Sequence, residues 1–290
     1  MKTLLIVNQQ AGKGKTKRRW PELQRQLERF GIRYDVHLTS RPKEATEVAR
    51  QAAAQYARVI AVGGDGTVNE VVNGLAGQPA AFGVLPSGTG NDFARMLQIP
   101  NNPYLAVQRL AVANERPADL LQLNGTYIAG AIGIGFDGAV AEDIDRAPWK
   151  KHAGSFAYVL GVLKLLFQFP PFTLRLQIDD RELLFPKCWL AAIGNSKFYA
   201  GGMKICPDAQ HDDGLLDICV VHNLTQFELL KLLPSVFSGR HVLHPNIVCL
   251  QGKSVRVRTD RPVPMHGDGE IFGKTPGDIT IHPHALRVLQ

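Results

Sequence analysis

The chain has no uninterrupted apolar stretch of about 18 residues, the length needed for a helix that crosses a membrane. Its start carries one lysine and only four consecutive apolar residues, Leu4 to Val7, which is too short for the apolar region of a signal peptide. We therefore expect a cytoplasmic protein without a transmembrane helix, whose first apolar residues form a strand.

Cysteine is scarce, and its spacing excludes the common zinc and redox motifs. The four cysteines form no CxxC pair; they are Cys188, Cys206, Cys219 and Cys249. Isolated cysteines in apolar strands are usually reduced residues of a hydrophobic core, and we expect that here.

A complete P-loop is also missing. Gly14-Lys15-Thr16 follows an apolar run, but GxxxxGK[ST] requires a glycine at position 9, where this chain has glutamine. A P-loop ATPase is therefore not predicted, and any phosphate must be held mainly by another loop.

The charge balance favours anionic partners. Thirty-three basic and 26 acidic side chains give a net charge of +7. Such a charge suits nucleotides, nucleic acid or an anionic membrane surface and does not choose among them.

Residues 1–118 alternate between apolar strands and amphipathic helices, which indicates a Rossmann-like α/β domain with a parallel sheet. The expected strands are 4–7, 33–38, 59–62 and 81–85, and the expected helices are 21–30, 44–56, 68–75 and 104–112. Residues 119–290 change to alternating apolar and polar residues with hairpin turns at Asn124-Gly125 and Asp179-Asp180. We expect an antiparallel β-sandwich or barrel there, with helices near 151–168 and 225–237. The apolar run 156–169 is either a core helix or the wall of a lipid cleft.

The first loop with chemical content is Gly63-Gly64-Asp65-Gly66-Thr67, between an expected strand and a helix. Glycines let backbone N–H groups approach phosphate oxygens, and the N-terminus of the following helix adds partial positive charge. Asp65 would hold Mg²⁺ through water, orient a hydroxyl or cap the helix. A tight turn with a capping Asp65 is the alternative.

A second loop, Ser87-Gly88-Thr89-Gly90-Asn91-Asp92, follows the next strand. The carboxyl ends of neighbouring parallel strands lie at one edge of a sheet, so the two loops should form one anion site.

GGDGTVNE followed by PSGTGNDFAR resembles the diacylglycerol kinase catalytic-domain family, soluble bacterial lipid kinases related to sphingosine and ceramide kinases. The similarity continues through GIGFDG (133–138), residues 194–217 and Asp268-Gly269-Glu270. GGDGT alone is shared with NAD kinases. The resemblance implies ATP and Mg²⁺ bound between an N-terminal nucleotide domain and a β-rich C-terminal domain.

The resemblance assigns nucleotide contacts residue by residue. These are Asn8, Gln9, Gln10, Ala11, Gly12, Thr39, Gly63, Gly64, Asp65, Gly66, Thr67, Asn69 and Thr89. Asp65, Asp92 and Asp119 would form an acidic network around catalytic Mg²⁺. Gln9 replaces the proline that is usual in the family's first loop.

Phosphoryl transfer needs a group that accepts the proton of the acceptor hydroxyl. The resemblance points to Glu270 as this base, with Asp268 and Asp65 as the other catalytic carboxylates. A surface turn is the alternative for 268–270.

Residues 210–217 carry several carboxylates, and oxygen-rich loops suit hard cations. The resemblance implies a structural metal held by Asp213 and by the backbone carbonyls of Gln210 and Leu215. A hydrated acidic turn is the alternative.

The sequence thus predicts an ATP-dependent lipid kinase, with diacylglycerol as the expected acceptor and phosphatidylglycerol or a sphingoid lipid as alternatives. It would visit an anionic membrane surface through basic residues, either Lys13, Lys15, Lys17, Arg18 and Arg19 or Arg146, Lys150 and Lys151 beside Trp149. An NAD kinase and a non-catalytic lipid- or nucleotide-binding regulator are the rivals. No nucleic-acid partner is expected, and the chain could be a monomer or a homodimer.

Overall fold

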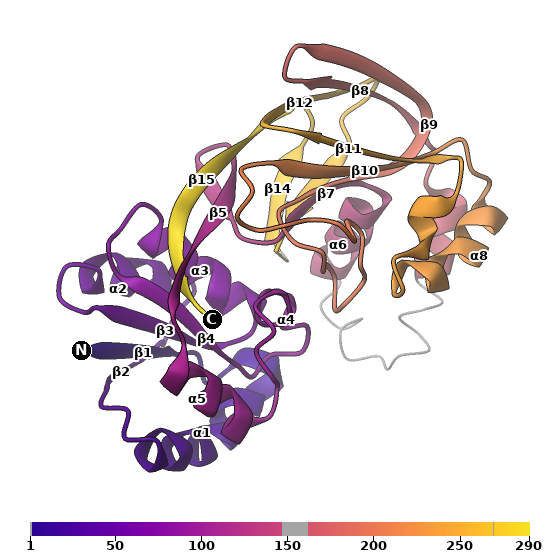
Figure 1. The fold of residues 1–290 in the computed structure, drawn as a ribbon. Helices are drawn as coiled ribbons and strands as arrows, with labels where there is room; N and C mark the ends of the chain where they lie inside the picture. Colours follow the sequence, from indigo (N-terminus) through magenta and orange to yellow (C-terminus); the bar gives the residue numbers. More distant parts are fainter. Residues whose placement is uncertain (1, 147–161, 269) are drawn as a thin grey trace.

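The computed structural model describes residues 2–146, 162–268 and 270–290, which form two lobes joined by two long strands (Figure 1). The strands of both lobes belong to one continuous sheet. In the part of the chain that is described, no helix is both long enough and apolar enough to cross a membrane.

The N-terminal lobe is a parallel sheet covered by helices. Its strands, in the order β4-β3-β1-β2, are β1 (Thr3–Val7), β2 (Asp35–Leu38), β3 (Arg58–Gly63) and β4 (Ala81–Pro86). Every residue of β1 and β4 is buried, as expected for parallel strands with both faces covered. The helices are α1 (Ala11–Arg29), α2 (Glu44–Ala52), α3 (Asp65–Leu75), α4 (Asp92–Met96) and α5 (Pro103–Val112).

The predicted elements of this lobe are confirmed, with one large difference in a boundary. Helix α1 begins ten residues before Pro21, which the sequence had suggested as its first residue. Its buried residues, Thr16, Trp20, Leu23 and Leu27, keep helical spacing across the proline. The periodicity was hidden because Thr16 is polar and because the helix is kinked at Gly12–Gly14, where φ is positive.

The C-terminal lobe is built from antiparallel strands, as predicted. They are β5 (Glu115–Leu123), β6 (Thr126–Ile128), β7 (Ala131–Gly135), β8 (Phe172–Ile178), β9 (Arg181–Gly194), β10 (Leu216–His222), β11 (Ile247–Gly252), β12 (Ser254–Thr259), β13 (Pro264–Gly267), β14 (Glu270–Lys274) and β15 (Gly277–Leu289). Both predicted hairpins form: Asn124 and Gly125 have positive φ in the β5–β6 turn, and Asp179 has positive φ between β8 and β9.

Helices α6 (Phe136–Arg146) and α8 (Gln226–Val236), with the short 3₁₀ helix η2 (Arg240–Leu243), complete the labelled elements. Residues 162–168 are helical, with Leu166 buried and Phe167 exposed. The remainder of the predicted helix, 151–161, lies outside the described residues, as do Trp149, Lys150 and the side chain of Arg146.

Strand β15 connects the two lobes. It pairs antiparallel with β5 and meets β4 in parallel at Val288 and Phe82. Ile279 and Ile281 belong to the core of the C-terminal lobe, whereas Leu286 and Val288 belong to the core of the N-terminal lobe. Strand β15, paired with β5, thus fixes the two lobes relative to each other.

Candidate active site

The two glycine loops meet backbone to backbone. They follow β3 and β4, which are neighbours in the sheet. A Cβ atom added to Gly88 would lie 2.4 Å from the Cα of Gly64, and one added to Gly64 would lie 3.0 Å from the Cα of Gly88. Only glycine at both positions allows this approach, and the two loops therefore lie side by side, as the anion-site prediction requires.

Asp65 binds the second loop. It is the first residue of α3, yet its Oδ1 accepts hydrogen bonds from the backbone N–H groups of Asp92 (2.7 Å) and Phe93 (3.3 Å) at the start of α4. A Cβ on Gly90 would lie 2.7 Å from the other oxygen, Oδ2. The carboxylate thus caps a helix other than its own and ties the two loops together.

The first loop of the chain packs on both glycine loops. Asn8 Nδ2 donates to Thr67 Oγ1 at 3.1 Å, and the hydroxyls of Thr16 and Ser87 are hydrogen-bonded at 2.7 Å. Lys15 Nζ donates to the carbonyl of Gly88 at 3.4 Å. The incomplete P-loop therefore supports the glycine loop through its side chains.

The remaining predicted nucleotide residues occupy varied positions around these loops. Gln9 and Gln10 form the turn into α1, and the Gln10 N–H binds Asn8 Oδ1 at 3.1 Å. Thr39 follows β2, and its N–H donates a hydrogen bond to the Val7 carbonyl; Thr89 is exposed. Asn69 is buried and accepts hydrogen bonds from Asn73, which also binds the backbone of Tyr127.

Asp92 links the nucleotide loops to the C-terminal lobe. It forms an ion pair with Arg95, and its Oδ2 accepts a hydrogen bond from the N–H of Gly201 at 2.6 Å. Burial raises the pKa of Asp92, the Gly201 N–H opposes the rise, and the negative charge of Asp65 adds to it. Arg95 also lies 5.5 Å from the ring centre of Phe198. The loop at 198–201 is thereby attached across the two lobes.

Asp268 faces the same site from the C-terminal lobe. Its carboxylate accepts hydrogen bonds from the N–H groups of Ala129 (2.8 Å) and Gly130 (3.1 Å). Burial raises the pKa of Asp268 to about 6; the two N–H groups oppose the rise, and the charge of Asp65 adds to it. The negative charge of Asp65 thus disfavours ionisation of Asp268.

Glu270 begins β14 and is exposed. It lies opposite Gly267 in the β13–β14 pairing, so Asp268 belongs to the turn and has a positive φ of 46°. The two carboxylates are therefore carried by a bend and not by a straight strand. Glu270 is open to solvent, whereas Asp268 is held by the backbone.

Asp119, predicted to join Asp65 and Asp92 around Mg²⁺, is held by backbone N–H groups of the C-terminal lobe. It is buried in β5, and its two oxygens accept backbone hydrogen bonds from Gly214 and His284, both at 2.7 Å. His284 lies where β15 shifts register against β5, and its free N–H needs an acceptor. Asp119 therefore joins the 211–214 loop to the strand that connects the lobes.

The predicted structural metal residues lie in that neighbouring loop. Asp213 is exposed, and its Oδ1 accepts a hydrogen bond from the N–H of Leu215 at 3.0 Å. Gln210 is exposed and Leu215 is partly buried. The donor atoms are all oxygen, which fits Mg²⁺.

Within residues 2–146, 162–268 and 270–290, no three acidic, histidine or cysteine side chains come together as a ready-made metal cage. Mg²⁺ usually keeps several waters and binds one or two carboxylates together with substrate phosphates. The single carboxylates of Asp65 and Asp213 fit that mode.

Sequence reasoning missed a polar cluster beside the site. Asp137, at the start of α6, accepts a hydrogen bond from the Tyr199 hydroxyl at 2.6 Å and lies 3.3 Å from Nε2 of His266. Burial alone would raise the pKa of Asp137, but the contacts with His266 and Tyr199 lower it; Asp137 in turn raises the pKa of His266 against the effect of burial. Asp137 stands in GIGFDG, and only this motif pointed to it.

Comparison with known proteins decides the family. A model described as the diacylglycerol kinase catalytic domain matches residues 2–123, and one described as the YegS C-terminal NAD kinase beta sandwich-like domain matches residues 130–290. The chain belongs to the diacylglycerol kinase family. It is a lipid kinase of this family, and the expected fold, with a parallel N-terminal and an antiparallel C-terminal part, is confirmed.

Individual relatives agree with this assignment. A diacylglycerol kinase of Staphylococcus saprophyticus is 31% identical over 279 residues, covering 94% of this chain and 90% of that protein. One of Mycobacterium tuberculosis is 33% identical over 238 residues, covering 80% and 76%. A crystal structure of a diacylglycerol kinase from Bacillus anthracis str. Sterne has the same fold, with a TM-score of 0.77 and 23% identity over 99% of this chain and 96% of that one.

Proposed function

We propose that this diacylglycerol kinase family member transfers the γ-phosphate of ATP to the free hydroxyl of diacylglycerol, giving phosphatidic acid. The observation that carries the proposal is the attachment of the Asp268 turn to the helix that Asp65 begins: Asn73 of α3 binds the backbone of Tyr127, and the nearby Ala129 N–H binds Asp268. Asp65 belongs to the glycine loops that are expected to hold phosphate, and Asp268 belongs to the segment that is expected to bind the acceptor hydroxyl. The negative charge of Asp65 raises the pKa of Asp268. A phosphate donor and an acceptor hydroxyl can therefore meet between them.

The nucleotide side is preorganised by the contacts between the loops. The Gly64–Gly88 approach and the Asp65 cap fix the loop backbone before ATP arrives. The N-terminus of α3 attracts anions, and Asn8 orients Thr67 beside it. These groups would hold the phosphates of ATP. Mg²⁺ carried by the nucleotide and Asp65 would neutralise charge on the transferred phosphate.

The acceptor side divides the work between two carboxylates. Glu270 is exposed and stands next to the turn, so it is placed to accept the proton of the hydroxyl. Asp268 is held by the N–H groups of Ala129 and Gly130 and fixes the turn from which Glu270 projects.

The lipid substrate requires contact with a membrane, and α8 offers an apolar surface for it. Four apolar residues are 48 to 81% exposed: Phe227 and Leu233 of α8, Phe237 directly after α8, and Leu243 of η2. Phe167 lies against Phe227 with 5.7 Å between ring centres. Val236 is the one residue of α8 that is buried. Exposed Lys231 and Arg240 accompany the apolar residues, which suits an anionic bilayer. We include peripheral docking of a cytoplasmic enzyme through α8 in the proposal.

A panel of acceptors tests the function. The purified protein should transfer labelled phosphate from ATP to diacylglycerol in mixed micelles and leave NAD unlabelled. Phosphatidylglycerol and a sphingoid base serve as further acceptors. Transfer to NAD alone would make the protein an NAD kinase; transfer to another lipid alone would exclude diacylglycerol as the substrate.

Docking is tested separately by sedimentation with anionic vesicles. Phe227→Ser combined with Leu243→Ser should weaken binding, whereas Leu184→Ser, an equally apolar and exposed position on β9, should not. Equal binding of both variants would exclude α8 as the docking surface.

A further inference from the structure

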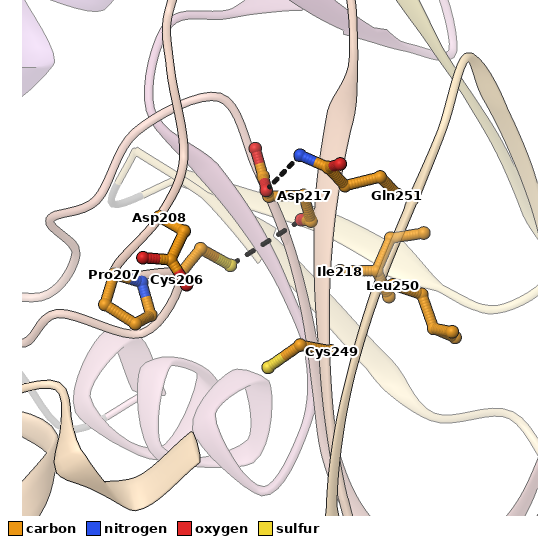
Figure 2. Close-up of a pocket in the computed structure, with 8 residues that line it drawn as sticks. All are labelled: Cys206, Pro207, Asp208, Asp217, Ile218, Cys249, Leu250 and Gln251. Carbon is orange, nitrogen blue, oxygen red and sulfur yellow. Dashed lines mark hydrogen bonds between the residues drawn. The ribbon is translucent and has the colours of Figure 1, made fainter. Parts of the chain in front are cut away.

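A pocket of about 280 Å³ lies between the 206–208 loop and strands β10 and β11 (Figure 2), and no residue of the glycine loops or of the Asp268 turn lines it. Its lining includes Cys206, Asp208, Asp217 and Cys249. Asp217 is 7% exposed, and its Oδ2 has no hydrogen-bond partner among the described residues, while Oδ1 accepts from Gln251 at 3.0 Å. The pocket therefore offers a free buried oxygen to a small polar molecule and access to a thiol.

Cys249 faces a second cysteine across the strands. Cys219 of β10 lies directly opposite Cys249 of β11 in the antiparallel register, so their side chains lie on the same face of the sheet. Directly opposite residues have Cα atoms about 4.5 to 5.5 Å apart. Disulfides accept Cα separations of about 4.4 to 6.8 Å. The Cα separation of a directly opposite antiparallel pair, whether hydrogen-bonded or not, is thus compatible with a disulfide between Cys219 and Cys249.

The four cysteines differ sharply in their surroundings. Cys188, Cys206 and Cys219 are buried, and Cys249 is exposed on β11, which pairs with β10 alone. This corrects the expectation that all four belong to the core. The neighbouring Cys219 thiol lowers the pKa of Cys249, with burial opposing it, whereas burial raises the pKa of Cys188 and Cys206 well above the ordinary thiol value. Oxidation of thiols selects exposed, thiolate-rich cysteines that lie next to a second cysteine.

We propose that Cys249 and Cys219 form a reversible dithiol–disulfide site, in which a peroxide entering the pocket oxidises Cys249 and Cys219 completes the bond. The Cys249 thiolate attacks one peroxide oxygen; the O–O bond breaks and hydroxide leaves, giving a sulfenic acid. The Cys219 sulfur then attacks the Cys249 sulfur; the S–O bond breaks, and oxygen leaves as water. Two thiols lose two electrons in total, and one hydrogen peroxide is reduced to two waters.

The Cys219–Cys249 disulfide would close a covalent loop that contains the residues between β10 and β11. This segment contains α8 and η2, which pack on the core formed by Cys219, Val221 and Ile247. A cross-link across its base restricts the unfolded chain, so the oxidised protein should unfold at a higher temperature than the reduced protein.

The test uses the full chain, hydrogen peroxide as the oxidant and dithiothreitol as the reductant. We expect the intact mass to fall by two hydrogen atoms, two of the four free thiols to be lost, and peptide mapping to show Cys219 linked to Cys249. Reduction should restore the thiols and the lower melting temperature.

Matched variants separate this pair from other outcomes. Cys249→Ser and Cys219→Ser should each abolish the linked peptide, and Cys206→Ser should retain it, because Cys206 donates to the Asp217 carbonyl at 3.6 Å and keeps its proton. A Cys206–Cys249 link, over-oxidation of Cys249 without a link, or four unreactive thiols would each overturn the proposal. If Cys219→Ser does not fold, thiol titration of the native wild type decides, since Cys249 should react first.

Discussion

Asp65 of the first glycine loop accepts a hydrogen bond from the backbone N–H of Asp92 in the second, with 2.7 Å between Oδ1 and N. One carboxylate thereby fixes the geometry of two loops and brings its charge to the site where Asp92 and Asp268 respond to it. Structure and charge can be separated because an asparagine keeps the Oδ1 acceptor and removes the charge.

Asp65→Asn should therefore fold like the wild type and lose activity. We expect kcat to fall by about a hundredfold or more, the effect typical of losing one preorganised electrostatic group. Asp65→Ala should in addition lose the cap on α4, which costs about 1 kcal/mol of stability. Kinetics and melting curves of the two variants check this. Equal activity of Asp65→Asn and wild type would exclude a catalytic role for the charge.

Substitution by alanine should have different effects on stability at two glycines of the loops, Gly88 and Gly66. Gly88→Ala would press a Cβ onto Gly64 and should destabilise the fold by about 1 to 3 kcal/mol, because backbone has to move. Gly66→Ala meets nothing within 4 Å and should fold normally. If the phosphates of ATP occupy that open space, Gly66→Ala should raise the KM for ATP and leave the stability of the fold unchanged. Urea unfolding and ATP titration of both variants measure the difference; a stable Gly88→Ala would contradict the close contact of the loops.

The glycine loops could be predicted from their local sequence motifs, and the hairpin could be predicted from Asn124-Gly125, because the positive φ angles of its turn suit these two residues. Side-chain contacts between residues that are far apart in the sequence could not be predicted. That Asp65 caps α4, or that Asp119 satisfies the backbone of β15, depends on how strands pack and on a register shift that leaves one N–H free. Exposed Cys249 was missed because an edge strand and a central strand have similar apolar sequences.

The buried Asp217 should make stability depend on pH. Burial raises its pKa from the ordinary 3.8 to about 6, so the folded protein binds this proton more tightly than the unfolded chain. The free energy of unfolding should thus fall as the pH rises from about 4 to about 6. Asp217→Asn removes this contribution and keeps the acceptor for Gln251. The stability of the variant relative to wild type should rise across that interval; a constant difference would contradict the shift.

Removal of metal should lower the stability of the wild-type protein, and this effect should depend on Asp213. A metal that binds only the folded protein stabilises it by mass action. Wild-type protein should melt at a lower temperature after EDTA and recover with Mg²⁺, whereas Asp213→Ala should melt at the lower temperature under both conditions. Asp212→Ala, its exposed neighbour, is the matched control. If Asp213→Ala keeps the Mg²⁺ response of the wild type, the structural site is elsewhere or absent.

The most direct measurement follows labelled γ-phosphate from ATP into phosphatidic acid, with wild type and Glu270→Gln compared in the same diacylglycerol micelles. The wild type should form the product in the presence of Mg²⁺. Glu270→Gln should fold, bind ATP and be slower by about 10² to 10⁴, the usual contribution of a general base. Absence of labelled phosphatidic acid with folded, ATP-binding wild type would contradict the proposed reaction, and full activity of Glu270→Gln would contradict the role of its carboxylate.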